Sequence, residues 1–116
     1  MRFLCLVYFE PQATAALSPS EKSVLGHDSM AYDKQLDARG NYIVAEALQP
    51  VHTARTIRVR AGKASATDGP FAETKEQLGG FILIKAANMD EALEIAAGIP
   101  SAKFGSIEVR PVMEFD

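Results

Sequence analysis

The sequence predicts an α+β domain in which two helices cover one face of a mainly antiparallel sheet. Two segments, residues 2–9 and 81–84, are apolar at every position or nearly so, as expected of strands that are covered on both faces. Two helix-start signals, at Ser18 and Asn88, each follow one of these strands. Together they indicate a repeated strand-to-helix connection around one sheet.

Length and composition set the class of protein. The chain has 116 residues, a net charge of −3 and 47% hydrophobic residues, which predicts a single domain over residues 1–116 with a core of its own. The one cysteine, Cys5, excludes a disulfide scaffold and a cysteine-rich zinc module. No apolar run is long enough for a membrane span, and the start lacks a cleavage signal, so we expect a cytoplasmic protein without membrane contact. No basic stripe suggests binding to nucleic acid.

The first helix has a complete start signal. Ser18 can cap it, Pro19 suits its first position, and Glu21 stands where a capping box places a carboxylate. We expect it to run to about Arg39 and to end at Gly40-Asn41. Its predicted apolar stripe consists of Val24, Leu25, Ala31, Tyr32 and Leu36. Asp28 falls within the span of this stripe, either as a buried carboxylate or, as we favour, at the edge of the stripe.

The remaining elements follow from alternation and turn residues. Strands are predicted at residues 42–48, 54–60, 64–67, 81–84 and 107–115, with a turn at residues 61–63. Asn88 caps the second helix, which ends at Gly98 and Pro100. Its predicted buried face consists of Met89, Ala92, Leu93, Ala96 and Ile99. The order strand, helix, strands, strand, helix, strand is that of ferredoxin-like α+β folds.

One face of this sheet remains uncovered. Both helices are expected on the same side, whereas residues 2–9 and 81–84 place apolar side chains on both sides. Packing against the sheet of a second subunit is the simplest way to bury the other face. The pattern therefore predicts a homodimer that forms through the sheet faces.

The most distinctive segment runs from Thr67 to Phe81. Asp68-Gly69-Pro70 is a turn signal, Phe71 can anchor the loop in the core, and Gly79-Gly80 allows a close approach of the backbone. The turn is followed by charged residues of both signs, namely Glu73, Lys75 and Glu76. This cluster predicts a small polar pocket near residues 68–75 that could bind a small polar ligand.

This segment resembles the signature of the YCII-related family, in the branch named for its Asp-Gly-Pro-Phe sequence. Residues 48–50, 56–60 and 105–111 are also similar to that branch. The resemblance implies a ferredoxin-like fold that dimerises sheet to sheet as a dimeric α/β barrel. Some members of the family are encoded beside extracytoplasmic-function sigma factors or fused to them. The resemblance therefore implies a binding or regulatory module, with a sigma factor as a candidate partner.

The alternative function is a cofactor-free enzyme of lyase or isomerase type. In that hypothesis Asp68 is the acid or base and Glu73 or Lys75 assists it, whereas the structural explanation of Asp68 is capping of its own turn. Relatives with a His–Asp pair carry the histidine on the first helix, about one turn later than His27, near Met30.

Other candidates for a binding site are two histidines and two strand residues. His27 and His52 are the only imidazoles, so we predict neither a multi-histidine metal site nor a cofactor. His52 lies in a loop that could face the Asp68 segment. Glu46 and Arg58 project from strand faces, where they either line a cavity between two dimer sheets or form solvated ion pairs.

Overall fold

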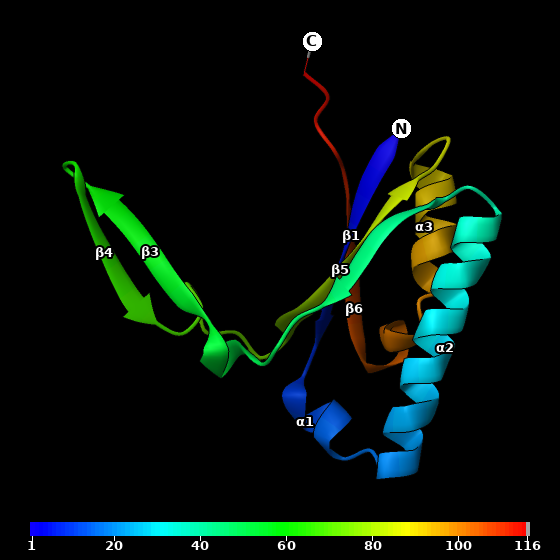
Figure 1. Ribbon diagram of the computed structural model, residues 1–116, viewed down its shortest axis with the longest axis horizontal. Coiled ribbons are helices and arrows are strands. Elements are labelled where there is room, and N and C mark those ends of the chain that lie inside the picture. The colour runs from blue at the N-terminus through cyan, green and yellow to red at the C-terminus, as the bar shows by residue number, and fades with distance from the viewer. Residues whose placement is uncertain (116) are drawn as a thin grey trace.

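The computed structural model describes residues 1–115 and confirms the α+β class. A four-stranded antiparallel sheet has the order β2-β5-β1-β6, and a separate two-stranded sheet pairs β3 with β4 (Figure 1). The strands of the larger sheet are β1 (Arg2–Phe9), β2 (Tyr42–Ala47), β5 (Gln77–Lys85) and β6 (Gly105–Pro111). The helices are α1 (Pro11–Ala15), α2 (Pro19–Ala38) and α3 (Met89–Ala97). Without the β3–β4 pair and the short α1, the element order is the predicted ferredoxin-like one.

Helix α2 begins and ends where the sequence predicts. The Ser18 hydroxyl accepts the Glu21 backbone N–H at 3.1 Å, and the Glu21 carboxylate accepts the Ser18 N–H at 2.9 Å. These two bonds satisfy amides that the helix itself leaves unpaired. At the other end Gly40 adopts a φ of +78°, which suits glycine.

The predicted stripe on α2 was wrong in part. Leu36 is fully buried and Leu25 and Tyr32 are half-buried, but Val24 is 58% exposed and Ala31 is also exposed. Asp28 is exposed, which agrees with a position at the edge of the stripe. Residues 24 and 25 are about 100° apart on a helix, so they cannot both face the sheet. Packing selects the line through residues 25, 29, 32 and 36, which brings Ser29 onto the inner face.

The core lies between α2, α3 and the sheet. Its side chains come from β1, β5 and α3, and include Phe3, Cys5, Val7, Ile82, Ile84, Ala92 and Ile95. Leu93, expected in the core, is exposed, and Ile95 takes the inward position on α3. The last strand ends at Pro111 rather than at 115, and Met113 and Phe115 are exposed. Proline removes a donor from the ladder, which explains the earlier end.

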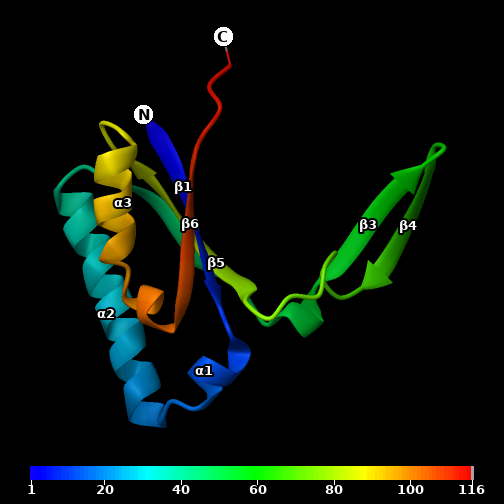
Figure 2. The same ribbon diagram turned by 180° about the vertical axis from the view of Figure 1, so that it is seen from behind.

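The two long helices lie on one face of the large sheet, as predicted (Figures 1 and 2). The opposite face, called here the open face, carries half-buried apolar side chains in adjacent strands: Leu4, Leu6, Tyr8, Phe81 and Leu83. An ion pair between Arg110 and Glu108 lies beside them on β6. The open face is therefore apolar in its middle and charged at one side.

The hairpin of β3 (Arg55–Arg60) and β4 (Lys63–Asp68) stands apart from the rest of the chain. Hairpin and large sheet diverge like the limbs of a V, with the open face turned toward the hairpin (Figure 1). The radius of gyration is accordingly 16.1 Å, compared with about 13 Å for a compact domain of this length. Alternation predicted these strands, but nothing in it indicated that they leave the main sheet.

Candidate functional site

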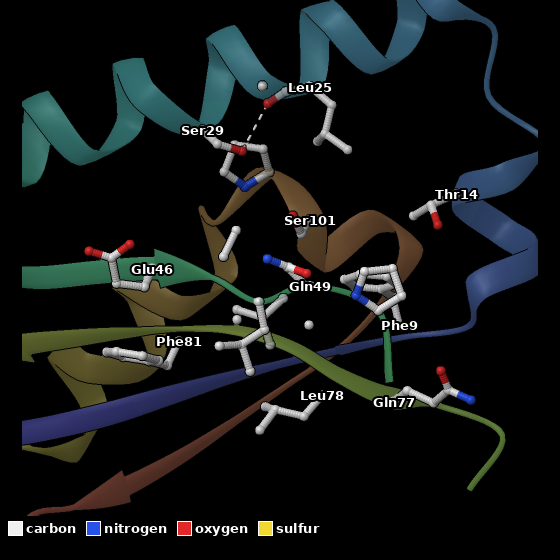
Figure 3. Close-up of a pocket in the computed structure, with 18 of the residues that line it drawn as sticks. Phe9, Thr14, Leu25, Ser29, Glu46, Gln49, Gln77, Leu78, Phe81 and Ser101 are labelled. Carbon is white, nitrogen blue, oxygen red and sulfur yellow. Dashed lines mark hydrogen bonds between the residues drawn. The ribbon is translucent and has the colours of Figure 1, made fainter. Parts of the chain in front are cut away.

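A cavity of about 1060 Å³ opens at one end of the large sheet. Its walls are α1, residues 22–33 of α2, the start of β5 and the loop after β2 (Figure 3). The lining is mainly apolar, with Val7, Phe9, Leu25, Leu48, Val51 and Leu78 among its members. A concave, mostly apolar site with few polar groups is the usual form of a small-molecule site.

Gly79 and Gly80 shape this cavity. The register between β1 and β5 skips Gly79, which makes it the extra residue of a bulge. A Cβ at Gly79 would collide with the ring of Phe9, and one at Gly80 would lie 2.8 Å from the backbone oxygen of Glu46. The expected close approach of the backbone is thus confirmed. Only glycines allow the Phe9 ring and strand β2 to lie this near to β5.

Polar groups occupy a few places in this lining. Asp33 is half-buried on α2, and burial raises the pKa of its carboxyl above the usual value. One turn earlier, the Ser29 hydroxyl donates to the Leu25 carbonyl oxygen at 2.8 Å (Figure 3). Glu46 and His52 contribute from the β2 edge and the turn after it, and both are exposed. The cavity can therefore hold an apolar body and form hydrogen bonds at its margin.

Two of the predicted site residues, Glu46 and His52, lie in this cavity, and the other five do not. Asp68 ends β4 on the hairpin, where its 91% exposed carboxylate accepts a hydrogen bond from Arg55 Nε at 3.1 Å. Arg58 is also on the hairpin and exposed, and His27 is exposed on α2. The single chain therefore does not bring Asp68 together with either histidine.

The Asp68-Gly69-Pro70 turn forms as expected, but its surroundings differ. Gly69 has a φ of +95°, and its N–H donates to the Ala54 carbonyl oxygen at 2.7 Å. Phe71 is 80% exposed, so the expectation that it anchors the loop in the core was wrong. The loop crosses from the detached hairpin to β5, outside the reach of the core.

The charged residues after this turn do not line the large cavity. Glu73 is exposed, and Lys75 pairs with Glu10 at 3.4 Å near the end of β1. The polar depression in this region is a shallow one on β6, where the Ser106 hydroxyl donates to the Glu76 carboxylate at 3.2 Å. Only Thr74 and Glu76 of the predicted segment take part in it.

Sequence reasoning missed Phe9, Ser29 and Asp33 as lining residues. Ser29 and Asp33 are four residues apart, on the same side of α2 as Leu25 and Leu36. The sequence did contain a signal for this part of the lining, because Ser29 and Asp33 are polar residues in line with inward-facing apolar ones. The predicted stripe, which included Val24 and Ala31, concealed this signal.

Two further findings concern residues 1–115, which are the residues that the structure describes. No cluster of three or more potential metal ligands occurs among these residues. Within the same range, none of the helices has the length and apolar character needed to cross a membrane. Burial raises the pKa of the Cys5 thiol to about 11, so this cysteine is an inert core residue.

The profile of the YCII-related domain matches residues 1–116. The chain belongs to the YCII-related family. This YCII-related chain is 40% identical over 114 residues to an uncharacterised protein of Rhizobium meliloti, an alignment that covers 97% of the chain and 92% of that protein.

A solved structure shares the fold of this YCII-related chain. It is the 5-chloro-2-hydroxyhydroquinone dehydrochlorinase of Burkholderia phenoliruptrix, described in complex with 2,5-dihydroxybenzoquinone. The two chains are 18% identical and superpose with a TM-score of 0.57, over 99% of this chain and 96% of the other. At this level of identity the likeness concerns the fold.

Proposed function

We propose that this YCII-related chain is a homodimeric binding module for a small molecule with a ring-sized apolar body and polar substituents. The cavity bounded by Gly79 and Gly80 carries the proposal. Its volume of about 1060 Å³ is ample for such a molecule, since ligand cavities usually measure about 300–1000 Å³. The apolar lining would hold the ring, and groups at the margin would bind the substituents.

The polar groups at the margin of the cavity limit the class of ligand that it can bind. Asp33 and Glu46 offer carboxyl oxygens, and His52 offers ring nitrogens. Burial raises the pKa of Asp33, and its carboxyl oxygens can accept hydrogen bonds from hydroxyl substituents. These groups suit hydroxyl or carbonyl substituents better than a phosphate, because no cluster of cations faces the cavity among its described lining residues.

The open face supports the homodimer. Its apolar centre, formed by residues such as Leu6 and Leu83, would be covered by the same surface of a second copy in a two-fold arrangement. Sedimentation of the purified protein tests this part of the proposal: a dimer at micromolar concentration is expected. A monomer at all concentrations would contradict it.

The regulatory setting is compatible with a binding module. Occupancy of the cavity would be the signal, and an extracytoplasmic-function sigma factor the candidate receiver, as the family resemblance implies. Co-purification of the tagged protein from cells, with and without added ligand, tests this point. Absence of a sigma factor from both samples would count against it.

The enzymatic alternative with Asp68 has less support in the single chain. A carboxylate that is 91% exposed and paired with Arg55 is solvated and unlike a buried acid or base. The alternative would require a second subunit to close over Asp68.

Binding experiments test the main proposal. The first probe is 2,5-dihydroxybenzoquinone, since the structural relative is described in complex with it, and hydroxybenzoates and phenols extend the series. Ser29→Phe fills the cavity from α2, whereas Ser23→Phe places the same ring on the solvent side of that helix. We expect at least one probe to bind, and Ser29→Phe alone to weaken its binding tenfold or more. Equal binding by both variants would overturn the assignment of the cavity.

A further inference from the structure

The β3–β4 hairpin has one apolar and one cationic face. The cross-strand pairs Ile57–Ala66 and Val59–Ala64 lie on one side. The pairs that alternate with them, Thr56–Thr67, Arg58–Ser65 and Arg60–Lys63, lie on the other side. Ile57 is 67% exposed and Val59 59% exposed, so in the single chain the apolar side is in water.

Such a hairpin needs a partner. An isolated two-stranded hairpin is at best marginally stable in water, because it buries too little apolar surface. The hydrogen bonds at its base, from Gly69 N–H to the Ala54 oxygen and from the Thr56 hydroxyl to the Gly69 oxygen, join the two ends of the hairpin to each other. The Arg55–Asp68 pair is exposed at the same end and contributes little.

The position of the hairpin points to a second copy of this chain. The open face of the sheet is turned toward the hairpin across the V (Figure 1). A second copy that packs its own open face against the first must turn its helix layer, α2 and α3, away from the contact and toward the first copy's hairpin. Two-fold symmetry then repeats this relation for the other hairpin.

The hairpin and the helix layer carry opposite net charges. The hairpin, residues 55–68, contains four cations and one anion, so its net charge is +3. Helices α2 and α3 together contain seven anions and two cations, so their net charge is −5. Opposite fields of this kind steer association and favour this pairing over others. Exposed apolar side chains on α2, among them Val24 and Met30, offer contacts for the apolar side of the hairpin.

We propose that the β3–β4 hairpin of one copy packs its apolar side, at Ile57 and Val59, against helix α2 of a second copy. This inference rests on the proposed homodimer but goes beyond contact through the sheet faces. Since α2 supplies Ser29, Met30 and Asp33 to the cavity lining, the hairpin would bring the partner subunit to the wall of the binding site.

Paired substitutions on the hairpin test the contact. Ile57→Asp places a carboxylate on the apolar side, and Ser65→Asp places the same group on the cationic side of the adjacent strand. Both side chains are exposed in the single chain, so neither change should prevent folding. We expect Ile57→Asp to raise the dimer dissociation constant at least tenfold, and Ser65→Asp to change it less than threefold. A smaller effect of Ile57→Asp than of Ser65→Asp would overturn the inference.

Photo-crosslinking locates the partner surface. Val59→p-benzoylphenylalanine is irradiated in a mixture of isotopically light and heavy protein, and the linked peptides are identified by mass spectrometry. Links from residue 59 to α2 of the other isotopic form are expected. Links confined to the same chain, in a protein that sediments as a dimer, would overturn the hairpin contact but leave the sheet-face dimer intact. A monomer in sedimentation would overturn both.

Discussion

The ring of Phe9 lies where a Cβ on Gly79 would be, so any side chain at position 79 would have to displace this ring. The bulge at Gly79 offsets β5 against β1 and leaves a hollow that the ring fills. The bulge in β5 therefore positions the Phe9 ring of β1, which forms part of the cavity wall.

Gly79→Ala should therefore disturb both stability and binding. The methyl group would push the Phe9 ring into the cavity or away from the sheet, at a cost of about 1–3 kcal/mol, typical of overpacking. Gly26→Ala on α2 is the control, because a Cβ there meets nothing within 4 Å, and it should stabilise the helix by up to about 1 kcal/mol. Chemical denaturation measures the change in the free energy of unfolding of each variant. Equal stabilities of the two variants would contradict the Phe9–Gly79 contact.

Tyr32→Phe tests the link between α2 and α3. The Tyr32 hydroxyl donates to the Ile95 carbonyl oxygen at 2.6 Å, and its loss leaves that half-buried acceptor without this partner. We expect a loss of about 1 kcal/mol in the free energy of unfolding. Tyr8→Phe, on the open face, removes the same atom at a position where no such bond is expected and should have a smaller effect on the monomer.

Asp33 should make stability depend on pH. Its folded-state pKa is raised by burial, so the folded protein binds the proton more tightly than the unfolded chain does. The contribution of Asp33 to stability is then greatest below the ordinary pKa of 3.8 and is lost as pH rises through the folded-state pKa. Asp33→Asn should be the more stable protein at pH 7, and its advantage should shrink at acidic pH. An advantage that is constant from pH 3 to pH 8 would contradict the burial of this carboxyl.

Cys5 should resist thiol reagents in the folded protein. It is fully buried in the core, and its pKa of about 11 leaves almost no thiolate at pH 8. Ellman's reagent should react with it only after denaturant is added, with one thiol released per chain. Rapid reaction of the native protein would show that this part of the core opens readily.

Asp68→Asn separates the two functional hypotheses. The Arg55–Asp68 pair is exposed, so its loss should change stability by less than about 1 kcal/mol. Because Asp68 lies outside the cavity, we also expect unchanged binding of the quinone probe, as measured by calorimetry. Unchanged folding combined with loss of a detected turnover would instead support the acid or base role of Asp68.

Local chemistry predicted most of the elements. The caps at Ser18 and Asn88 and the alternation at residues 55–60 identified helices and strands correctly, since these signals act over a few residues. The glycine pair was also correctly interpreted as a close approach. The covered face of α2 was partly wrong, because Val24 and Leu25 are both apolar and only packing decides between them.

The site was harder to predict than the fold. Glu46 and His52 lie in the lining of the cavity, whereas Asp68 and Glu73, proposed as site residues because their segment is rich in charge, lie outside it. Their actual place depends on the hairpin leaving the sheet, which is a long-range property. Alternation of apolar and polar residues predicts a strand, but it does not show which of the two sheets the strand joins.

The detached hairpin also bears on the behaviour of the chain before it meets another copy. Its outer strand edges have free backbone donors and acceptors, which are templates for uncontrolled strand addition. Arg58, Arg60 and Lys63 place positive charge along this ribbon, and like-charge repulsion between ribbons would oppose stacking into aggregates. The same cations that give the hairpin a charge opposite to that of the helices in the proposed homodimer would thus keep freshly synthesised chains in solution.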